Sequence, residues 1–383
     1  MRKKYILAKR FMEFCAIFPI KRKVVFQSYF GDHYNCSPKA IFEKMRDLLP
    51  DCEYVWLLKD DSIQIPGAKV VRPDTWSALY HLATAAIWVD NARKPIWTVK
   101  RAGKQFYVHT DHAAFAIKKG EGAVEEKLNR AYVARAKHDS AMIDLLLSAS
   151  RWQSETIYRR VFWYDGEIME CGLPRSDVFF GDGIAEQRRV REFYGLAEDV
   201  KLALYAPTFR NSADLSMYLT TEDCDRVRKA LCARFGGEWK LLVRLHPNMM
   251  DKQERIQYSD HILNGSAYDE INDLIMASEL LITDYSSCSY DAMEAGKNVL
   301  IYATDVDEYA EERGFYFTMD ELPFPWAADI DGFLRRIEEF DEELYRLRAR
   351  EFADGYGSFN NPNASRMVAE HLIEKLNSKF WKM

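Results

Sequence analysis

Residues 280–296 read LLITDYSSCSYDAMEAG, and this stretch decides the fold. Leu280–Asp284 is a short apolar run of the kind that forms a buried strand, and the two serines after it open a stretch with helical character. A strand that passes through a tight turn into a helix is the repeating step of a doubly wound α/β sheet. The stretch therefore predicts a parallel sheet with a turn at the carboxyl end of this strand.

The same alternation of strand-like and helix-like segments occupies both halves of the 383-residue chain. The runs that predict strands are Lys23–Ser28, Tyr54–Lys59, Ala68–Val71, Ile87–Asp90, Lys104–Thr110, Leu145–Ser150 and Glu167–Cys171, then Lys201–Pro207, Lys240–Pro247, Leu280–Asp284 and Asn298–Tyr302. Helical patterns lie between them or follow them, among them Ser37–Leu49, Thr75–Ala86, a helix from about Arg151, Thr221–Phe235, Tyr268–Ala277, Ser286–Ala295 and Ala364–Phe380. Two doubly wound, Rossmann-type domains that face a central cleft are expected, with ligands at the carboxyl ends of the strands.

The expected domain limits follow from this pattern. We place a basic segment at residues 1–20, an acceptor-side domain at 21–184 and a nucleotide-side domain at 185–383. The Gly-containing stretch Phe179–Ile184 is the expected hinge. The C-terminal helix is counted with the second domain, with packing back on the first as the alternative.

The net charge of −6 is unevenly distributed. Residues 1–23 carry eight Lys and Arg against one acid, whereas the rest of the chain carries 45 basic and 58 acidic groups. This balance argues against a nucleic-acid partner and indicates a local anionic partner for the N-terminus. A helix over residues 5–18 would have a stripe made of Leu7, Phe11, Phe14 and Phe18. A basic amphipathic helix of this kind suits an anionic membrane surface, and packing on its own domain is the alternative.

The cysteine content and the hydropathy of the sequence indicate the cellular compartment in which the protein is expected. Seven cysteines without a C-x-x-C pair indicate neither a zinc knuckle nor a disulfide framework, which favours a reducing cytoplasm. No stretch approaches the ~20 apolar residues that span a bilayer. A peripheral protein at the cytoplasmic face of the membrane is expected.

The turn in the opening stretch has the features of a phosphate-binding loop. Ser286 and Ser287 would present hydroxyls, free backbone N–H groups and the positive end of a helix dipole at the sheet edge. Asp284 is expected to orient the loop, because a carboxylate beside a phosphate is repulsive. A plain serine N-cap is the alternative.

Two other strand ends carry polar residues toward the same edge. Arg244 and His246 alternate along the strand KLLVRLHP and so project from one face, which suits pyrophosphate binding and stabilisation of a leaving phosphate. An Arg–carboxylate pair beside a core histidine is the alternative. The strand KLALYAP breaks at Pro207 and delivers Thr208 and Arg210 into a loop.

A histidine-containing turn follows the strand KQFYVHT in the first half. It reads His109-Thr110-Asp111-His112, with Lys118-Lys119 shortly after it. An imidazole there suits a general base that faces the phosphate site across the cleft. A shared metal ion is not favoured, because successive strand residues face opposite ways. P-loop, G-x-G-x-x-G and G-x-S-x-G motifs are missing, so the corresponding enzyme classes lose support, and no cofactor is expected.

Eight segments taken in order resemble one family. They are FPIKRKVVFQSYFG near the start, the His112 segment with Lys118-Lys119, DLLLSAS (144–150), CGLPRSD (171–177), YAPTFR (205–210), RLHP (244–247), ITDYSS (282–287) and ERGFYF (312–317). With these motifs the chain resembles, over roughly residues 19–375, the CDP-glycerol:poly(glycerophosphate) glycerophosphotransferases. These are teichoic acid primases and polymerases, so the resemblance implies a GT-B fold.

The resemblance also implies a reaction. Glycerol phosphate, or in relatives ribitol phosphate, would pass from CDP-glycerol or CDP-ribitol to a hydroxyl of a membrane-linked acceptor, with release of CMP. The acceptor would be a lipid-linked saccharide or an existing polyol-phosphate polymer. His112 would be the base that activates the acceptor hydroxyl, and His246 with Arg244 would lie near the pyrophosphate.

The remaining implied residues belong to the donor site. Ser286 and Ser287 would hold the β-phosphate, with Asp284 positioning their loop. The other residues expected to line the site are Thr208, Arg210, Arg313 and Lys118.

The chain departs from the family at the expected base. Where the family has Trp-His-Gly, this chain has Asp111-His112-Ala113. We expect altered acceptor preference rather than lost activity. Two other functions stay open: a GT-B nucleotide-sugar glycosyltransferase or epimerase, and a non-catalytic nucleotide-binding subunit of envelope assembly.

Overall fold

The computed structural model describes residues 3–210, 216–245 and 256–378, which form two compact units. The first unit contains the chain up to Ala114, residues 120–177 and the chain from Ser358 on. The second contains Phe115–Lys119 and Val178–Gly357. The second unit thus begins at Val178, and a short segment of the first half belongs to it.

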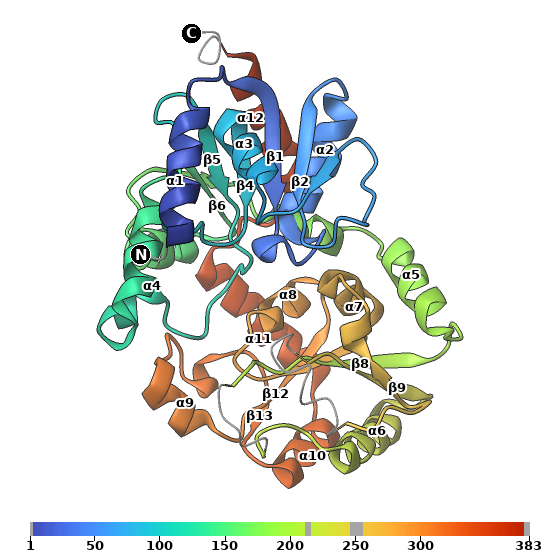
Figure 1. Ribbon diagram of the computed structural model, residues 1–383. Helices are drawn as coiled ribbons and strands as arrows, with labels where there is room; N and C mark the ends of the chain where they lie inside the picture. The colour runs from blue at the N-terminus through green and yellow to red at the C-terminus, as the bar shows by residue number, and fades with distance from the viewer. Residues whose placement is uncertain (1–2, 211–215, 246–255, 379–383) are drawn as a thin grey trace. The chain divides into compact units, whose positions relative to one another are not determined.

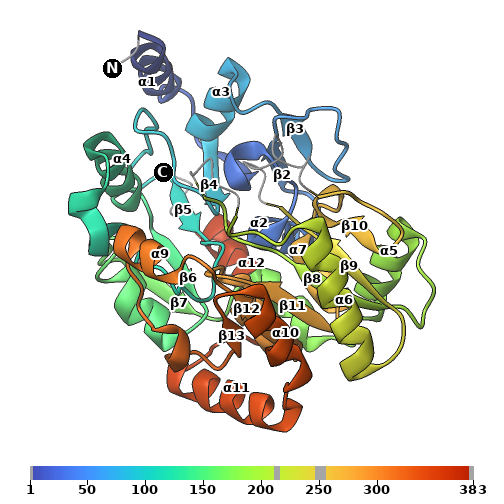
Figure 2. The same cartoon turned by 90° about the horizontal axis from the view of Figure 1, so that it is seen from below.

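The first unit is built on a parallel sheet of seven strands (Figure 1). The strands are β1 Lys21–Gln27, β2 Glu53–Leu57, β3 Lys69–Val71, β4 Ala85–Asp90, β5 Phe106–His109, β6 Leu145–Ser148 and β7 Glu167–Glu170. Its helices are α1 Lys3–Cys15, α2 Cys36–Leu48, α3 Trp76–Thr84, α4 Arg130–Ser140 and α12 Ala364–Asn377. Figure 2 shows α12 beside α2, although the two helices come from opposite ends of the chain. The central strands are buried on both faces because helices cover them, which explains their continuous apolar runs.

The second unit repeats this plan with a parallel sheet of six strands. The strands are β8 Lys201–Tyr205, β9 Trp239–Val243, β10 Ile262–Asn264, β11 Leu280–Thr283, β12 Asn298–Tyr302 and β13 Trp326–Ala327. Its helices are α5 Ile184–Tyr194, α6 Thr221–Phe235, α7 Ile271–Ala277, α8 Cys288–Glu294, α9 Val306–Arg313, α10 Ile330–Glu338 and α11 Glu342–Tyr356. Helices α6 and α10 pack side by side (Figure 2).

Strand order places a ligand-binding position in each unit. The orders are β3-β2-β1-β4-β5-β6-β7 and β10-β9-β8-β11-β12-β13, so the winding direction reverses between β1 and β4 and again between β8 and β11. Ligands of doubly wound sheets bind beyond the carboxyl ends of the strands at such reversals. The predicted pair of doubly wound parallel sheets is confirmed, and the loops of interest are those that follow β8 and β11.

Short elements without a strong apolar pattern escaped prediction. β10 and β13 have three and two residues, which is too short for a periodicity to register. Helix α4 buries little besides Val133 and Ala136 on its apolar side, so its sequence has a weak helical signal. The helix expected from about Arg151 is a π-helical segment over Gln153–Tyr158.

The N-terminal helix differs from its expected form. It ends at Cys15, and its buried residues are Ala8, Met12 and Cys15, which lie about a quarter turn around the helix from the predicted stripe. α1 packs on α3, where the rings of Phe11 and Trp76 lie 4.8 Å apart. Leu7 and Phe14 are each 58% exposed. The helix therefore packs on its own unit through Ala8, Met12 and Cys15 together with Phe11 of the predicted stripe, and leaves Leu7 and Phe14 in solvent.

Candidate active site

The carboxylate of Asp284 joins the two loops at the strand-order reversal of the second unit. Its Oδ1 accepts hydrogen bonds from the backbone N of Thr208 at 2.8 Å, from Thr208 Oγ1 at 2.6 Å and from the backbone N of Tyr285 at 2.7 Å. Its Oδ2 accepts from Arg210 Nη2 at 2.9 Å. Asp284 is 3% exposed, so these bonds replace the water that a carboxylate otherwise needs. The predicted loop-orienting role fits this geometry.

Arg210 is held on all sides by the same cluster. Its Nε and Nη2 donate to the Asp305 carboxylate at 2.7 and 3.1 Å, and its Nη1 donates to the carbonyl of Thr208 at 2.8 Å. The guanidinium also lies over the rings of Tyr285 and Tyr309, at 4.9 and 4.3 Å from their centroids. This geometry makes Arg210 a brace of the loop, and its direct contact with a substrate stays a prediction.

The two serines lie directly after this cluster, at the end of β11. Both are half-buried, and helix α8 begins one residue after Ser287. Ser286 Oγ accepts from the backbone N of Cys288 at a long 3.4 Å. Within the described part of the chain, Ser287 occupies the N-cap position without a side-chain capping bond. The alternative of a plain serine N-cap is therefore not favoured for Ser287, whose hydroxyl suits a ligand at this edge.

Lys118 and Arg313 supply positive charge beside the Asp284 loop. Lys118 forms an isolated antiparallel bridge with Phe315, and Arg313 is the last residue of α9. Burial lowers the pKa of Lys118 to about 8; Asp284 opposes this shift, whereas Arg313 and Arg210 add to it. Asp284 and Asp305 are both paired with Arg210, so the positive charges of Lys118 and Arg313 beside this cluster suit a phosphate.

Arg244 is hydrogen-bonded to backbone carbonyls of a neighbouring loop. Its guanidinium donates to the carbonyl oxygens of Gly265 at 3.1 Å, of Asp269 at 2.9 Å and of Tyr268. These bonds attach Arg244 to the loop that follows β10. Its contact with a pyrophosphate stays a prediction, and His246 lies outside the described residues.

His112 lies in the first unit, in the loop that follows β5. Its side chain is 54% exposed, its Nδ1 is 3.4 Å from Asp111 Oδ1, and its ring is 5.7 Å from that of Tyr29. The backbone of this loop is fixed, because Asp111 Oδ1 accepts from His112 N at 2.7 Å and Gln153 Nε2 donates to the Ala113 carbonyl at 2.7 Å. An exposed imidazole on a fixed backbone suits proton transfer to or from a bound ligand.

His109, at the end of β5, holds this loop through a hydrogen bond to its backbone. It is 3% exposed, and its Nδ1 accepts from the backbone N of Asp111 at 3.2 Å. Burial lowers its pKa well below the usual range, so the ring stays neutral. Asp111 has a positive φ of 53°, and the bond to His109 helps to hold this strained turn. In the ranges that the structure describes, no three His, Cys, Asp or Glu side chains are grouped as a metal site.

Several residues of these clusters were missed from sequence. Asp305 follows β12, so the rule that polar residues gather at carboxyl strand ends would have found it. Arg175, in the CGLPRSD segment, donates to the His112 carbonyl, and this residue was not given a role of its own. Gln153 sits in the π-helical segment and carries no signal in the sequence that would have revealed it.

The Asp284–Arg210 pair predicts a specific loss of stability. Asp284→Asn keeps an oxygen for Thr208 and removes the charge, so Arg210 stays buried with one carboxylate where it had two. We expect a loss of about 3 kcal/mol in the free energy of unfolding, measured by urea titration. Asp331→Asn, which breaks the exposed pair with Arg226, is the control and should cost less than about 0.5 kcal/mol. Equal stability of the two variants would contradict the bracing role.

The lowered pKa of Lys118 leads us to predict that anion binding depends on pH. Its ammonium is present below a pKa of about 8 and is lost above it. The affinity for a pyrophosphate ligand such as CDP-glycerol should fall about tenfold between pH 7 and 9.5, because one charged contact disappears. Lys118→Arg keeps its charge over this range, so its affinity, measured by calorimetry, should stay level. The same fall in both proteins would show that another group titrates.

Comparisons with known proteins agree with these features. The sequence model of the family described as CDP-Glycerol:Poly(glycerophosphate) glycerophosphotransferase matches residues 11–374. A teichoic acid poly(glycerol phosphate) polymerase of Staphylococcus epidermidis is 29% identical over 375 residues, which cover 92% of this chain and 50% of that protein. A polymerase of the same description from Bacillus spizizenii is 25% identical, and the match covers 92% of both chains.

A solved structure of a teichoic acid polymerase also resembles this chain over nearly its whole length. The wall teichoic acid polymerase TagF matches with a TM-score of 0.85 at 26% identity, over 98% of this chain and 95% of the solved one. The chain spans about half the length of the Staphylococcus epidermidis relative. The family match covers nearly the whole chain, and the two doubly wound units are of the GT-B-like type. The chain therefore belongs to the CDP-glycerol:poly(glycerophosphate) glycerophosphotransferase family.

Proposed function

We propose that this chain transfers glycerol phosphate or ribitol phosphate from a CDP-polyol to a hydroxyl of a membrane-linked acceptor, in the synthesis of teichoic acid or a related cell-surface polymer. The observation that carries the proposal is the loop of Ser286 and Ser287, braced by Asp284, at the strand-order reversal of the second unit. Its position is where doubly wound sheets bind nucleotides, and Lys118 and Arg313 provide the cations that a pyrophosphate needs.

The transfer is a single in-line displacement at phosphorus. The acceptor oxygen forms a bond to the β-phosphorus of the CDP-polyol, while the bond from that phosphorus to the bridging oxygen breaks and CMP leaves with the electron pair. The imidazole of His112 takes the proton of the acceptor hydroxyl. The products are CMP and a phosphodiester, so no oxidant or reductant is needed.

The second unit holds the donor and stabilises charge. The hydroxyls of Ser286 and Ser287 donate to the β-phosphate, and the Lys118 ammonium and the Arg313 guanidinium stabilise the charge that grows on the equatorial and leaving oxygens. Asp284 and Arg210 act through the loop, because their bonds to each other and to Asp305 occupy them. A rigid cradle of this kind needs little reorganisation when the charge moves.

The histidine turn bears on acceptor choice. Asp111 stands where the family has Trp, and its carboxylate caps the His112 backbone in place of an indole beside the imidazole. The turn is therefore smaller and more polar, which favours an acceptor with hydroxyls or charge next to the reacting group. The glycosyltransferase and epimerase alternatives would attack an anomeric carbon, and the binding-subunit alternative would leave CMP unreleased.

The proposal predicts separate effects on binding and turnover. We expect His112→Ala to lower CMP release at least about 100-fold with the affinity for CDP-glycerol unchanged, because the base touches the acceptor and not the donor. His261→Ala, at an exposed histidine of the second unit, is the control. Incubation with CDP-glycerol and CDP-ribitol separately, with lipid-linked acceptors, gives the donor from the product mass. Unchanged turnover in His112→Ala would contradict the assignment of the base.

Because the proposed acceptor is linked to a membrane, the protein needs a surface that binds a bilayer, and helix α1 has the properties of such a surface. We infer that the chain binds peripherally to an anionic bilayer at the cytoplasmic face through this helix. Leu7, Phe14 and Ile17 are 58%, 58% and 68% exposed, and Lys3, Lys4 and Lys9 are exposed on the same short segment. Exposed apolar side chains between lysines suit insertion at the boundary between headgroups and acyl chains. In the described ranges, no helix has the length and apolar character needed to cross a bilayer.

This surface predicts a loss of vesicle binding. Replacing Leu7, Phe14 and Ile17 together by Ser should weaken binding to phosphatidylglycerol vesicles at least tenfold, because about 1.5 kcal/mol or more is lost for each side chain that inserts. Leu344 and Leu347 on α11 are also exposed, so their replacement by Ser is the matched control. Sedimentation with vesicles measures both. Equal binding of the two variants would move the membrane contact elsewhere, without affecting the transferase proposal.

A further inference from the structure

A five-residue segment of the first half of the chain belongs to the second unit. Residues up to Ala114 and from Gly120 lie in the first unit, whereas Phe115–Lys119, which we call the strap, lies in the second. The strap begins three residues after His112 and includes Lys118. One short stretch thus carries the proposed base and one of the proposed phosphate ligands.

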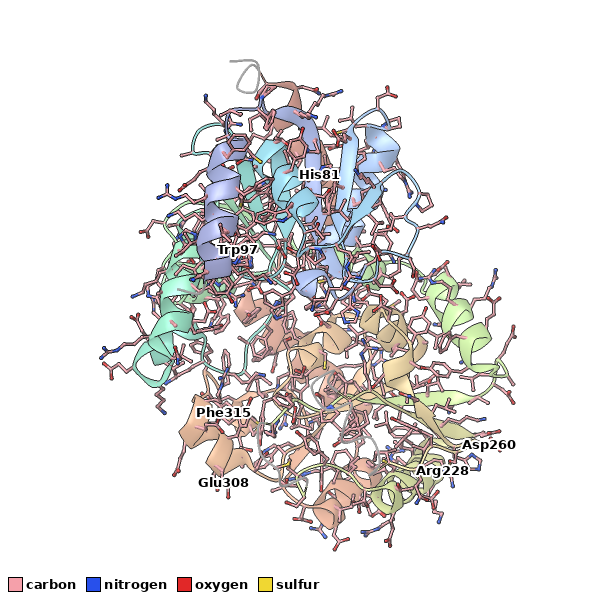
Figure 3. The ribbon with its side chains drawn as sticks, viewed as in Figure 1. His81, Trp97, Arg228, Asp260, Glu308 and Phe315 are labelled. Atoms are coloured by element: carbon pink, nitrogen blue, oxygen red, sulfur yellow. The ribbon has the colours of Figure 1, made fainter. Side chains whose placement is uncertain are left out.

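The backbone of the strap is hydrogen-bonded to the ERGFYF segment. Tyr316 N donates to the Ile117 carbonyl at 2.8 Å, and Lys119 N donates to the Gly314 carbonyl at 2.9 Å. Phe315, labelled in Figure 3, forms the antiparallel bridge with Lys118. Gly314 has a φ of 71° and a ψ of 149°, a backbone conformation that glycine adopts and other residues rarely do, so this pairing favours glycine. The strap and the ERGFYF segment are therefore two halves of one small antiparallel ladder.

Side chains of the strap reach the helix that follows the serine loop. Phe115 is 1% exposed; its ring stacks on Tyr290 of α8 with centroids 5.4 Å apart and contacts Phe317 at 5.3 Å and Tyr356 at 5.1 Å. Aromatic contacts of this size each contribute beyond the area they bury. Phe115 is thus locked to the element on which Ser286 and Ser287 depend.

At its N-terminal end the strap is connected to His112 by a very short stretch of chain. Three residues of extended chain span at most about 11 Å, so His112 cannot lie farther than this from Phe115. Ala114 is fully buried in between, and Gln153 holds the Ala113 carbonyl. Covalent connection therefore limits how far the imidazole can move from the α8 cluster.

We propose that the strap positions His112 for proton transfer, with Phe115 as the positioning residue. This rests on the proposed function, because it assigns a role to the base of that reaction. A phosphate bound to Lys118 would fix the side chain of a residue whose backbone the ladder already holds, and the strap would pass this constraint to the His112 loop over three residues. A misplacement of about 1 Å between reacting groups can cost about 100-fold in rate, so a short, stiff connection has a direct effect on turnover.

Two kinds of variant test the strap. Phe115→Ala removes the anchor, and Phe115→Leu should restore most of the activity because it keeps a large apolar side chain. A Gly-Gly insertion between Ala114 and Phe115 lengthens the connection by about 7 Å and leaves every ring in place. The control is a Gly-Gly insertion between Gly181 and Asp182, in an exposed stretch of the second unit. Melting temperatures of all variants report folding.

Turnover and an NMR signal give independent readouts. The kcat for CMP release should fall at least about tenfold in Phe115→Ala and in the Ala114 insertion. In the insertion, which leaves the rings and Lys118 in place, KM for CDP-glycerol should stay within about twofold of the parent. In protein with ¹³C-labelled histidine, CDP-glycerol should shift the His112 signal, assigned by its loss in His112→Ala. The Ala114 insertion should abolish this shift, and the Gly181 insertion should not.

The outcomes separate the strap from the transferase proposal. Parental kcat and a parental His112 response in the Ala114 insertion would overturn the strap. An unshifted His112 signal in the parent protein with bound CDP-glycerol would overturn it too, whether or not CMP is released. A shifted signal that the insertion abolishes, in a parent that releases no CMP, would support the strap and contradict the proposed function.

Discussion

The buried carboxylate of Asp284 is the point on which the second unit's ligand-binding edge depends. It accepts from both loops at the strand-order reversal and pairs with Arg210, which in turn pairs with Asp305 beyond β12. One hydrogen-bonded network therefore fixes the carboxyl ends of the neighbouring strands β8, β11 and β12. Asp284, at the centre of this network, is only 3% exposed. A buried network of this kind is favourable only when all its members are satisfied, so it tolerates little movement. That rigidity fixes the loop that carries Ser286 and Ser287 at the end of β11.

Charge in this protein is local, and the net value is a poor guide to its partners. The chain carries −6 overall, yet Lys118 lies where Arg210 and Arg313 act on it as well as the Asp284 carboxylate. The N-terminal segment concentrates a second group of cations on an exposed helix. A nucleotide diphosphate and an anionic membrane are thus compatible with an acidic protein, because each contacts only one of these groups.

The fold could be predicted from sequence to a large extent, whereas the roles of individual side chains could not. Continuous apolar runs such as those of β8 and β11 marked the buried strands, and the strand–turn–helix pattern placed the serine loop at a carboxyl strand end. The strand-order reversal between β8 and β11 is known from the structure alone. The alternation of apolar and polar residues along a strand shows which side chains lie at the ligand-binding edge of the sheet. It does not show which side chain, backbone group or ligand each of them contacts there. Arg210 and Arg244 were therefore expected at substrate, and the structure places their guanidinium groups on carboxylates and carbonyls. The strap escaped prediction because its ladder joins segments about 200 residues apart, and local patterns carry no such information.

The most direct test of the central claim is phosphorus NMR of the protein with CDP-glycerol and a lipid-linked acceptor. Transfer of glycerol phosphate predicts that the two pyrophosphate signals disappear while the monoester signal of CMP and a phosphodiester signal grow at equal rates. CMP with free glycerol phosphate would show hydrolysis instead of transfer. Intact CDP-glycerol in the presence of acceptor and folded protein would contradict the account.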